Sequence, residues 1–326
     1  MKSSIYYTLT PRISAHAALR TALFALPVLL AAAPVGAAQF SVTNIGTLGY
    51  FFSLDGSINA AGQVVGSAST DANGSHQAFL WQSGSKQYLG TLGGTNSRAS
   101  AINDAGQVVG SADTSGNTAN HAFLLQSGNM QDLGTLGGTS SGANDINAAG
   151  LVVGYAATSG NAAEHAFLWQ SGNMQDLGTL GGTYSSASAI NAAGQVVGSA
   201  QTSGNAAYHA FLWQSGSMQD LGTLGDDSWA SDINDAGQVV GAYVVTPGAP
   251  WRAFMWQSGS MQDIGGGYVY SSAHSINAAG QVVGWAESAY GPQVGFLWQS
   301  GSMTDLNNLI DLCRVGQSIM PMISTI

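Results

Sequence analysis

The sequence contains a single cysteine and few charged side chains. Cys313 has no second cysteine with which to pair, so disulfide bonds cannot stabilise this chain. Charged residues make up only 7% of the 326 positions, whereas long solvent-exposed helices normally carry many Glu, Lys and Arg residues. Together with 45 glycines, this composition predicts tight turns and short strands. Disorder is excluded, because 45% of the residues are hydrophobic and they recur in a fixed pattern.

Basic residues are scarcer than acidic ones. The sequence has seven Lys and Arg residues and 17 Asp and Glu residues. Three of the seven basic residues lie within the first 38 positions. The remaining four are Lys86, Arg98, Arg252 and Arg314. Four basic and 17 acidic residues give residues 39–326 a net charge of −13. Because such a surface repels phosphate groups, we exclude nucleic acid as a partner.

The chain also lacks a hydrophobic run long enough for a clear membrane-spanning helix, which needs about 20 apolar residues. The apolar run near the N-terminus extends only from Thr21 to Ala33 and is followed by small residues up to Ala38. A basic start, a short apolar core and a small-residue end are typical of a cleaved secretory signal. We predict that residues 1–38 are a signal peptide and that the protein is secreted, periplasmic or on the cell surface. An uncleaved anchor is the alternative. We expect no stable membrane insertion after cleavage.

An internal repeat organises the rest of the sequence. The block Ile-Asn-x-Ala-Gly-x-Val-Val-Gly occurs six times at intervals of 43 or 44 residues. Its asparagines are Asn59, Asn103, Asn147, Asn191, Asn234 and Asn277. A second block, Phe-Leu-Trp-Gln-Ser-Gly, and a third, Met-Gln-Asp-Leu-Gly-Thr-Leu-Gly-Gly, recur with the same period. A degraded copy of the third block occupies residues 43–49.

Each repeat is predicted to form four short strands. In one copy these strands cover residues 166–170, 175–180, 186–191 and 195–200. Ser171-Gly172-Asn173 lies between two apolar stretches and predicts a hairpin. Gly194 stands where a short hairpin loop favours a left-handed residue. Strands joined by such turns form an antiparallel meander.

The predicted strands are apolar on both faces, since neighbours such as Val196 and Val197 point to opposite sides of a sheet. Small sheets buried on both faces must pack between similar sheets. The fold prediction is therefore all-β, a β-propeller of about six four-stranded blades built from 43–44-residue repeats. The alternative is a β-solenoid with two coils per repeat, but its parallel coils would not need hairpin turns.

The repeated blocks resemble those of the HAF family of extracellular bacterial repeat proteins. The resemblance rests on His-Ala-Phe-Leu-Trp at 165–169 and 209–213, followed by the Met-x-Asp-Leu-Gly-Thr-Leu-Gly-Gly and Ile-Asn-x-Ala-Gly-Gln-Val-Val-Gly blocks. It implies secretion or surface display, and because it does not imply an established biochemical activity, it supplies no catalytic residues. We assign residues 39–309 to the repeat domain. Residues 310–326 depart from the repeat and are predicted to be an atypical C-terminal tail, left by truncation or a frame shift.

No motif for catalysis or for binding a cofactor is evident, and we predict neither a catalytic residue nor a metal site nor a cofactor. His121, His165 and His209 occupy equivalent positions. We expect each of them to bond within its own blade, because equivalent residues of neighbouring blades lie too far apart to share one ion. The repeated aspartates are expected to be hydrogen-bonding groups at turns or strand ends. They are Asp132, Asp176, Asp220, Asp263 and Asp305.

Function is expected where the repeats differ, because loops on a rigid scaffold carry recognition. The loops before the Ile-Asn strands supply the candidate ligand-binding residues Tyr184, Asp226, Asp227, Trp229, Tyr268 and Tyr270. A second class of loop, expected at the opposite face, supplies Glu164, Tyr208, Trp251, Arg252 and Tyr290. Exposed aromatics could stack on sugar rings. The alternative is that they cover the blade edges.

These observations favour an extracellular binding or surface-interaction module without catalysis, whose partner is a glycan or another cell-envelope component. Two other functions stay open. One is a polysaccharide hydrolase or lyase that uses Asp226 and Asp227, which break the repeat pattern. The other is a structural matrix component with no discrete ligand.

Overall fold

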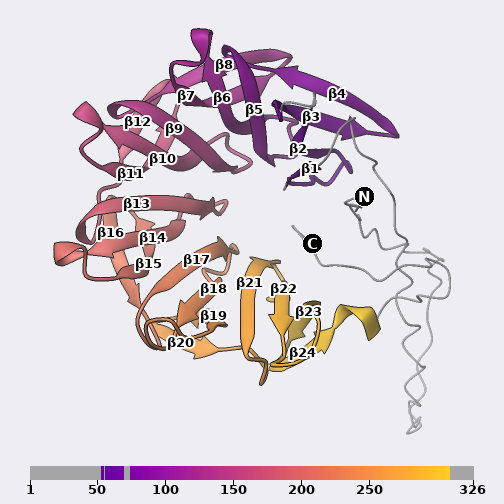
Figure 1. The fold of residues 1–326 in the computed structure, drawn as a ribbon, viewed down its shortest axis with the longest axis vertical. Coiled ribbons are helices and arrows are strands. Elements are labelled where there is room, and N and C mark those ends of the chain that lie inside the picture. Colours follow the sequence, from indigo (N-terminus) through magenta and orange to yellow (C-terminus); the bar gives the residue numbers. More distant parts are fainter. Residues whose placement is uncertain (1–52, 55, 70–73, 309–326) are drawn as a thin grey trace, which may run out of the picture.

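The computed structural model describes residues 53–54, 56–69 and 74–308. In this part of the chain the regular structure is β-strand, with four short 3-10 turns and no α-helix. The strands form six successive four-stranded units, which we call blades 1 to 6, and the blades follow one another round an arc (Figure 1). Blades 2, 3 and 4 are joined into one 12-stranded sheet. The predicted signal peptide, the degraded repeat at 43–49 and the tail at 310–326 lie outside the described residues.

The strands of each blade are consecutive in the chain. Blade 1 contains β1 (Ser53–Leu54), β2 (Val64–Ser69), β3 (His76–Gln82) and β4 (Ser85–Gly90). Blade 2 contains β5 (Gly93–Ile102), β6 (Val108–Thr114), β7 (Asn120–Gln126) and β8 (Asn129–Gly134). Blade 3 contains β9 (Gly137–Ile146), β10 (Val152–Thr158), β11 (Glu164–Gln170) and β12 (Asn173–Asp176).

The second half of the chain repeats this order. Blade 4 contains β13 (Gly181–Ile190), β14 (Val196–Thr202), β15 (Tyr208–Gln214) and β16 (Ser217–Gly222). Blade 5 contains β17 (Ser228–Ile233), β18 (Val239–Val244), β19 (Trp251–Gln257) and β20 (Ser260–Asp263). Blade 6 contains β21 (Tyr270–Ile276), β22 (Val282–Glu287), β23 (Val294–Gln299) and β24 (Ser302–Asp305).

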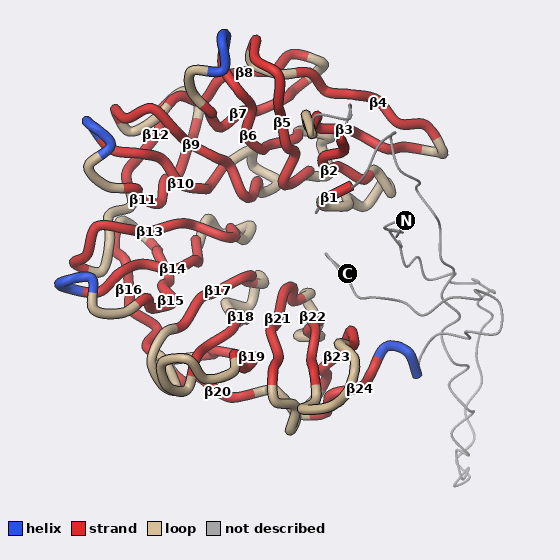
Figure 2. The backbone as a smooth tube through the Cα atoms, viewed as in Figure 1, coloured by secondary structure: helices blue, strands red, loops and turns tan. Residues whose placement is uncertain are grey.

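Within each blade, every strand pairs antiparallel with the next strand of the chain. The first strand of each blade lies on the inside of the arc (Figure 2). Single parallel residue pairs, Asn120 with Ser140 and Glu164 with Tyr184, connect blades 2, 3 and 4. This hairpin topology confirms the predicted meander and contradicts the β-solenoid alternative.

The two predicted turns have the expected backbone conformations. Ser171 and Gly172 have φ values of 49° and 91° and connect the paired residues Gln170 and Asn173, as a two-residue type I′ hairpin requires. Gly194 has a φ of 78°. Both hairpins are confirmed.

One pair of strand boundaries was predicted wrongly. The outer strand of blade 3 was expected to extend over residues 175–180, but β12 ends at Asp176. The inner strand of blade 4, expected over 186–191, begins earlier, because β13 starts at Gly181. The Leu177 N–H still donates to the Ala166 carbonyl oxygen beyond the end of β12, and Gly178, with a φ of 76°, begins the connection to blade 4.

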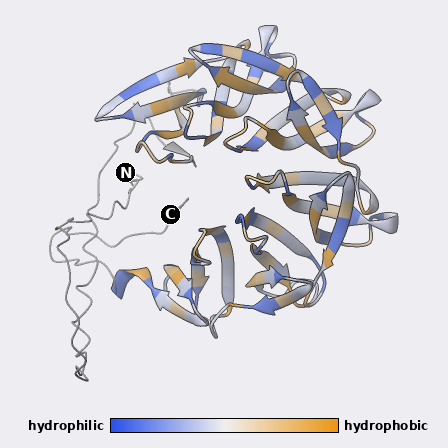
Figure 3. Ribbon diagram, turned by 180° about the vertical axis from the view of Figure 1, so that it is seen from behind, coloured by the Kyte–Doolittle hydropathy of each residue, from blue (hydrophilic) through white to orange (hydrophobic). Residues whose placement is uncertain are grey.

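The hydrophobic cores lie between the blades. Phe167 and Trp169 of blade 3 pack against Val109 and Leu124 of blade 2 in one buried cluster. Four further clusters fill the other blade-to-blade contacts, and apolar residues recur in the strands of all six blades (Figure 3). Because blades 2 to 5 each bury both faces against neighbouring blades, none of them has a complete core of its own.

The glycine of the Val-Val-Gly block allows the first two strands of a blade to approach closely. A Cβ atom added at Gly198 would overlap the carbonyl oxygen of Ser186 on the paired strand. The register of this pair shifts between Ala187 and Ala189, which is a β-bulge. The glycine is therefore required by the bulge in the inner strand.

The asparagine of each Ile-Asn turn connects its own blade to the next one. Asn191 Oδ1 accepts a hydrogen bond from the Gln195 N–H at 3.0 Å, and Asn191 Nδ2 donates to Gln195 Oε1 and to the backbone oxygen of Asn234 in blade 5. The same link from side chain to backbone occurs five times, from blade 1 to blade 6. These asparagines are buried, and we call their series the asparagine ladder.

The ladder ends at Asn277 of blade 6. Its Nδ2 donates to Gln281 Oε1 at 2.7 Å, and in the part of the chain that is described no hydrogen bond joins it to Asn59 of blade 1. Among the described strands, none of blade 1 pairs with a strand of blade 6 either.

We predict that Asn191→Ala lowers the free energy of unfolding by about 2–4 kcal/mol, because it leaves buried backbone groups of two blades without partners. Urea denaturation followed by circular dichroism measures the change. Asn173→Ala is the matched control, since Asn173 is exposed in a Ser-Gly hairpin, and a change within about 0.5 kcal/mol is expected. Equal losses for the two variants would contradict the role of the ladder.

Candidate functional site

The blade topology places the variable loops on one face. The strands of a meander alternate in direction, so the connection that enters a blade and the loop between its second and third strands lie at the same end. Direct contacts show this: Leu136, before β9, bridges Thr158 at the end of β10, and the Thr139 N–H donates to Asn161 Oδ1 at 2.8 Å. We call this end the loop face. The opposite end, formed by the Asn-x-Ala-Gly and Ser-Gly turns, is the turn face.

The prediction that the two classes of variable loop occupy opposite faces was therefore wrong. Both classes lie on the loop face, so Tyr208 and Trp251 lie at the same end of the molecule as Trp229. The physical reason is the antiparallel order of the four strands, which returns the chain to the loop face after the second and fourth strands of each blade.

On blades 2, 3 and 4 the loop between the second and third strands is the same. Each of these blades carries the same 3-10 turn, η1 (Ser115–Asn117), η2 (Ser159–Asn161) and η3 (Ser203–Asn205). The asparagine that ends each turn accepts hydrogen bonds from the backbone N–H and the hydroxyl of a threonine near the start of the blade's first strand. This repeated network holds two loops of the blade together.

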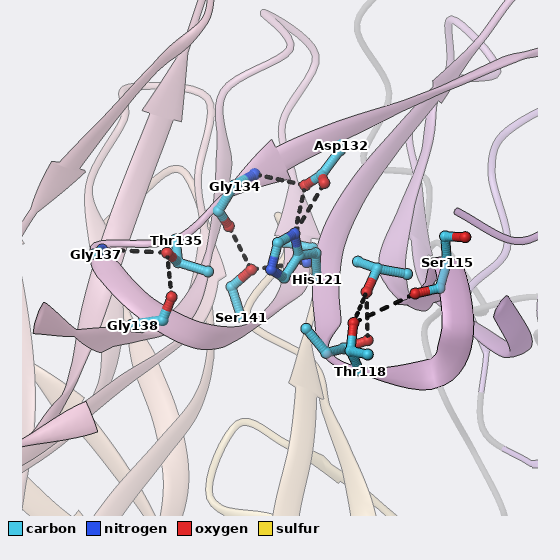
Figure 4. Close-up of polar contacts among 12 residues, drawn as sticks. Ser115, Thr118, His121, Asp132, Gly134, Thr135, Gly137, Gly138 and Ser141 are labelled. Carbon is cyan, nitrogen blue, oxygen red and sulfur yellow. Dashed lines mark hydrogen bonds and ion pairs between the residues drawn. The ribbon is translucent and has the colours of Figure 1, made fainter. Parts of the chain in front are cut away.

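The three equivalent histidines bond within their own blades. His121 Nδ1 lies 3.0 and 2.8 Å from the two carboxylate oxygens of Asp132 on the adjacent strand (Figure 4). His165 with Asp176 and His209 with Asp220 repeat this geometry. The expected pairing inside each blade is confirmed. Among the described residues, no group of three or more His, Cys, Asp or Glu side chains is arranged to hold a metal ion.

The same aspartate fixes the start of the connection to the next blade. Asp132 Oδ1 accepts the Gly134 N–H at 2.8 Å, and the Ser141 hydroxyl donates to the Gly134 carbonyl oxygen (Figure 4). Ser141 Oγ also accepts the Ala122 N–H, so this hydroxyl is fully engaged in the fold. The recurring His, Asp and Ser residues thus serve the scaffold and do not form a nucleophile and base.

Blade 5 replaces the histidine with an arginine. Arg252 Nε donates to Asp263 Oδ2 at 2.6 Å, and the Tyr243 hydroxyl donates to the same oxygen at 2.9 Å. Arg252 Nη1 also donates to the Tyr268 backbone oxygen. Burial raises the pKa of Asp263, but the hydrogen bonds from Arg252, the Gly265 N–H and Tyr243, together with the Arg252 charge, outweigh this effect and hold the pKa below its ordinary value. The Arg252 cation is therefore neutralised within the blade.

An aromatic cluster lies next to this ion pair. The ring of Trp229 on β17 is stacked on Tyr208 of blade 4, with centroids 6.4 Å apart, and contacts Trp251 of blade 5 at 5.7 Å. Trp251 is 50% exposed, whereas Trp229 is partly buried between its two neighbours. We call Tyr208, Trp229 and Trp251 the aromatic cluster.

The other predicted site residues have different positions. Tyr184 and Tyr270 are exposed on the loop face, at 46% and 42%. Asp227 Oδ1 accepts the Tyr208 N–H at 2.7 Å, and the Asp226 backbone N–H donates to the Val244 carbonyl oxygen at 2.7 Å. Tyr268 packs against the core between blades 5 and 6. Asp227 and Tyr268 therefore support the surface.

The exposed large apolar side chains concentrate on the loop face of blades 4, 5 and 6. Besides Trp251 and the two tyrosines above, they are Leu224, Val245 and Tyr290. Leu224 and Val245 were missed from the sequence, although both lie in loops that depart from the repeat. We call the aromatic cluster together with Tyr184, Leu224, Val245, Tyr270 and Tyr290 the loop-face site.

The inner strands carry two aspartates that the sequence analysis missed. The Asp145 carboxylate accepts the N–H groups of Ile146 and of Ile190 in blade 4. Asp232 accepts the N–H groups of Ile233 and of Ile276 in blade 6, and the Ser275 hydroxyl donates to it. Burial raises the pKa of both groups, that of Asp232 to about 6. The available signal was that Asp replaces Ala or Ser two positions before the repeated Asn.

The turn face has an open depression of about 290 Å³, which is lined by residues of blades 3, 4, 5 and 6. Its lining consists mostly of repeat residues, with Ile190, Ile233 and Ile276 among them. Both aspartates are engaged in links between blades, and the lining has few polar groups that differ between repeats. Recognition is therefore better supported at the loop face.

Comparison with solved structures identifies the fold. The chain is similar to the β-propeller domain of the Trilobed protease from Pyrococcus furiosus, described as having an open velcro topology, with a TM-score of 0.54, 10% identity, and coverage of 82% of this chain and 86% of that one. It is also similar to Pyrococcus horikoshii acylaminoacyl peptidase, with a TM-score of 0.51, 12% identity and 86% of this chain covered. For TolB from Acinetobacter baumannii the TM-score is 0.49, with 13% identity and 67% of this chain covered.

The chain spans about half the length of two of these proteins, 48% of the peptidase and 54% of TolB. At these identities the likeness shows the β-propeller fold alone. No protein-family model matches the sequence, and no curated protein matches it. No helix within the described ranges has the length and apolar character needed to cross a membrane.

We predict a pH-dependent difference between the wild-type protein and Asp232→Asn. Because the folded-state pKa of Asp232 is about 6, above its ordinary value of 3.8, its contribution to stability is fully present below about pH 4 and is lost as the pH rises through 6. The variant should therefore gain stability relative to the wild type between pH 4 and pH 8, by up to about 3 kcal/mol. Urea titrations across this range measure the difference.

Asp235→Asn is the control for this measurement, since Asp235 is an exposed carboxyl on the turn face. A stability difference between wild type and Asp232→Asn that stays constant from pH 4 to pH 8 would show that Asp232 titrates normally.

Proposed function

We propose that this β-propeller is a non-catalytic binding module exported from the cell, and that its loop-face site binds a glycan or another cell-envelope component. The observation that carries the proposal is the concentration of exposed aromatic side chains on blades 4, 5 and 6. Export is supported by the signal-like residues 1–38 and by the resemblance of the repeats to the HAF family.

The divergence of the repeats supports this location. Blades 2, 3 and 4 share one Ser-Gly-Asn turn and one threonine–asparagine network. In blades 5 and 6 the corresponding loops instead contain Pro-Gly-Ala-Pro and Tyr-Gly-Pro sequences, and they present Val245 and Tyr290 to solvent. A scaffold role explains the shared turns, and it does not explain the exposed apolar groups that replace them.

The aromatic cluster suits recognition of sugar rings. The apolar face of a sugar stacks on Trp or Tyr, whose indole N–H or hydroxyl can also form hydrogen bonds. The Trp229 ring packs against the exposed Trp251 ring, with a distance of 5.7 Å between the ring centroids, and so restricts its position. An anchor fixed before binding loses little conformational freedom when the ligand arrives, which favours affinity.

The hydrolase alternative depends on Asp226 and Asp227. Asp227 Oδ1 accepts the Tyr208 N–H, so this carboxylate already has a structural role. The two residues are also adjacent in the chain, and no geometry favours them as an acid and a base on opposite sides of a glycosidic bond. Binding without catalysis therefore has the stronger support.

We predict that Trp251→Ala weakens glycan binding at least tenfold, because a truncated aromatic anchor typically costs about 1–2 kcal/mol or more. A glycan array with the secreted protein finds the ligand, and calorimetry measures the change in affinity. Tyr88→Ala is the matched control, since Tyr88 is 41% exposed on β4 of blade 1, away from the loop-face site. The control should bind like the wild type.

An array and an envelope pull-down that both stay blank with correctly folded protein would remove the support for this function. If Trp251→Ala bound with unchanged affinity, the binding surface would have to lie elsewhere on the molecule.

A further inference from the structure

We infer that the loop-face site selects glycans without acidic groups and rejects chains that carry carboxylate, sulfate or phosphate. This inference rests on the proposed function and specifies its ligand class. It follows from the charges that surround the aromatic side chains on blades 4, 5 and 6.

Within the described ranges, the loop-face site offers no available Lys or Arg side chain. Lys86, Arg98 and Arg252 are the basic Lys and Arg residues of the described ranges. Lys86 lies on β4 of blade 1 and Arg98 on β5 of blade 2. Arg252, beside the aromatic cluster, is held by Asp263 and by the Tyr268 backbone oxygen. An acidic sugar at this site would therefore meet no free Lys or Arg side chain of the described residues, although binding sites for carboxylate and phosphate usually contain Arg or Lys.

Carboxylates flank the exposed rings instead. Asp226 and Asp227 lie in the connection that leads to Trp229, and Asp227 bonds to the backbone of Tyr208. On blade 6, Glu287 lies directly opposite Tyr270 in the β21–β22 pair. Opposed residues in such a pair have Cβ atoms about 5 Å apart, well within the screening length of about 8 Å at physiological salt. The carboxylates therefore repel an anion bound at the rings.

The same carboxylates suit a neutral sugar. Ionised Asp and Glu are acceptors only, and they form strong hydrogen bonds with hydroxyl donors. A neutral sugar stacked on Trp251 or Tyr270 would present hydroxyl groups around the edge of its ring. Aromatic faces with peripheral carboxylates thus match a polyhydroxylated, uncharged ligand, and they tolerate an amine-bearing one.

The test measures binding of the secreted protein to soluble polymers of three kinds. The neutral polymers are mixed-linkage β-glucan, xylan and mannan, the amine-bearing polymer is chitosan, and the acidic polymers are polygalacturonate and alginate. Calorimetry is carried out at low and at high sodium chloride concentration. We expect a neutral polymer to bind with an affinity that changes less than about twofold with salt, because stacking and hydroxyl hydrogen bonds are screened little. Acidic polymers should bind at least ten times more weakly.

A double variant, Asp226→Asn with Glu287→Gln, removes two negative charges and keeps polar side chains of similar size. We expect it to reduce the difference between neutral and acidic polymers to less than about threefold, while Trp251→Ala weakens all binding. Asp104→Asn is the control, because Asp104 lies on the turn face of blade 2 and its carboxylate accepts the Ala60 N–H. This control should keep the wild-type preference.

The outcomes separate the two proposals. Preferred binding of polygalacturonate or alginate that is lost in Trp251→Ala would overturn the inference and leave the proposed binding function intact. An unchanged preference in the double variant would also overturn it, since the carboxylates would then not determine selectivity. Folded protein that binds none of the polymers would contradict both proposals.

Discussion

The hydrogen bond from each Ile-Asn turn to the backbone of the following blade is the constraint on which the rest of the structure depends. Asn147, for example, caps its own turn through Oδ1 and reaches the Asn191 carbonyl oxygen through Nδ2. One buried side chain thus fixes both the hairpin and the position of the neighbouring sheet. Because the five links repeat the same geometry, they place the apolar faces of successive blades in register, and the cores form between them.

This use of repeated polar residues explains why so much of the sequence carries no separate chemistry. The asparagines join blades, the His–Asp pairs join the outer strand to its neighbour, and the serine hydroxyls fix the connections between blades. A scaffold built in this way tolerates change mainly at its loops. Blades 4, 5 and 6 contain such changes, and there Trp229, Trp251 and Tyr270 stand where blades 2 and 3 have Arg, Gly, Asn, Glu or Ser residues.

Much of the fold could be predicted because it is encoded locally and repeated six times. The turn at Ser171 and Gly172 and the left-handed Gly194 follow from residue type, and the pairing of each histidine inside its blade follows from equivalence between repeats. The loop-face site was predicted only in part. Trp229, Tyr184 and Tyr270 were identified, but Tyr208 and Trp251 were placed on the wrong face, because strand direction through the whole meander decides which loops meet.

Other features depend on tertiary contacts that no local pattern encodes. Asp145 and Asp232 reach the backbone of the next blade, and only the assembled arc shows that their carboxylates are buried. In the same way, Asp227 was predicted to bind a ligand, but its carboxylate accepts the Tyr208 N–H and therefore has a structural role.

Recognition at the loop face is tested most directly by a chimera that converts the loops of blades 5 and 6 to the repeat pattern. The loop-face residues there, including Trp229, Trp251 and Tyr270, are replaced by their counterparts from blade 3, and binding to the glycan preferred by the wild type is measured with thermal unfolding. The account predicts a cooperative melt and a loss of binding of at least tenfold. A chimera that folds and binds like the wild type would show that recognition lies elsewhere.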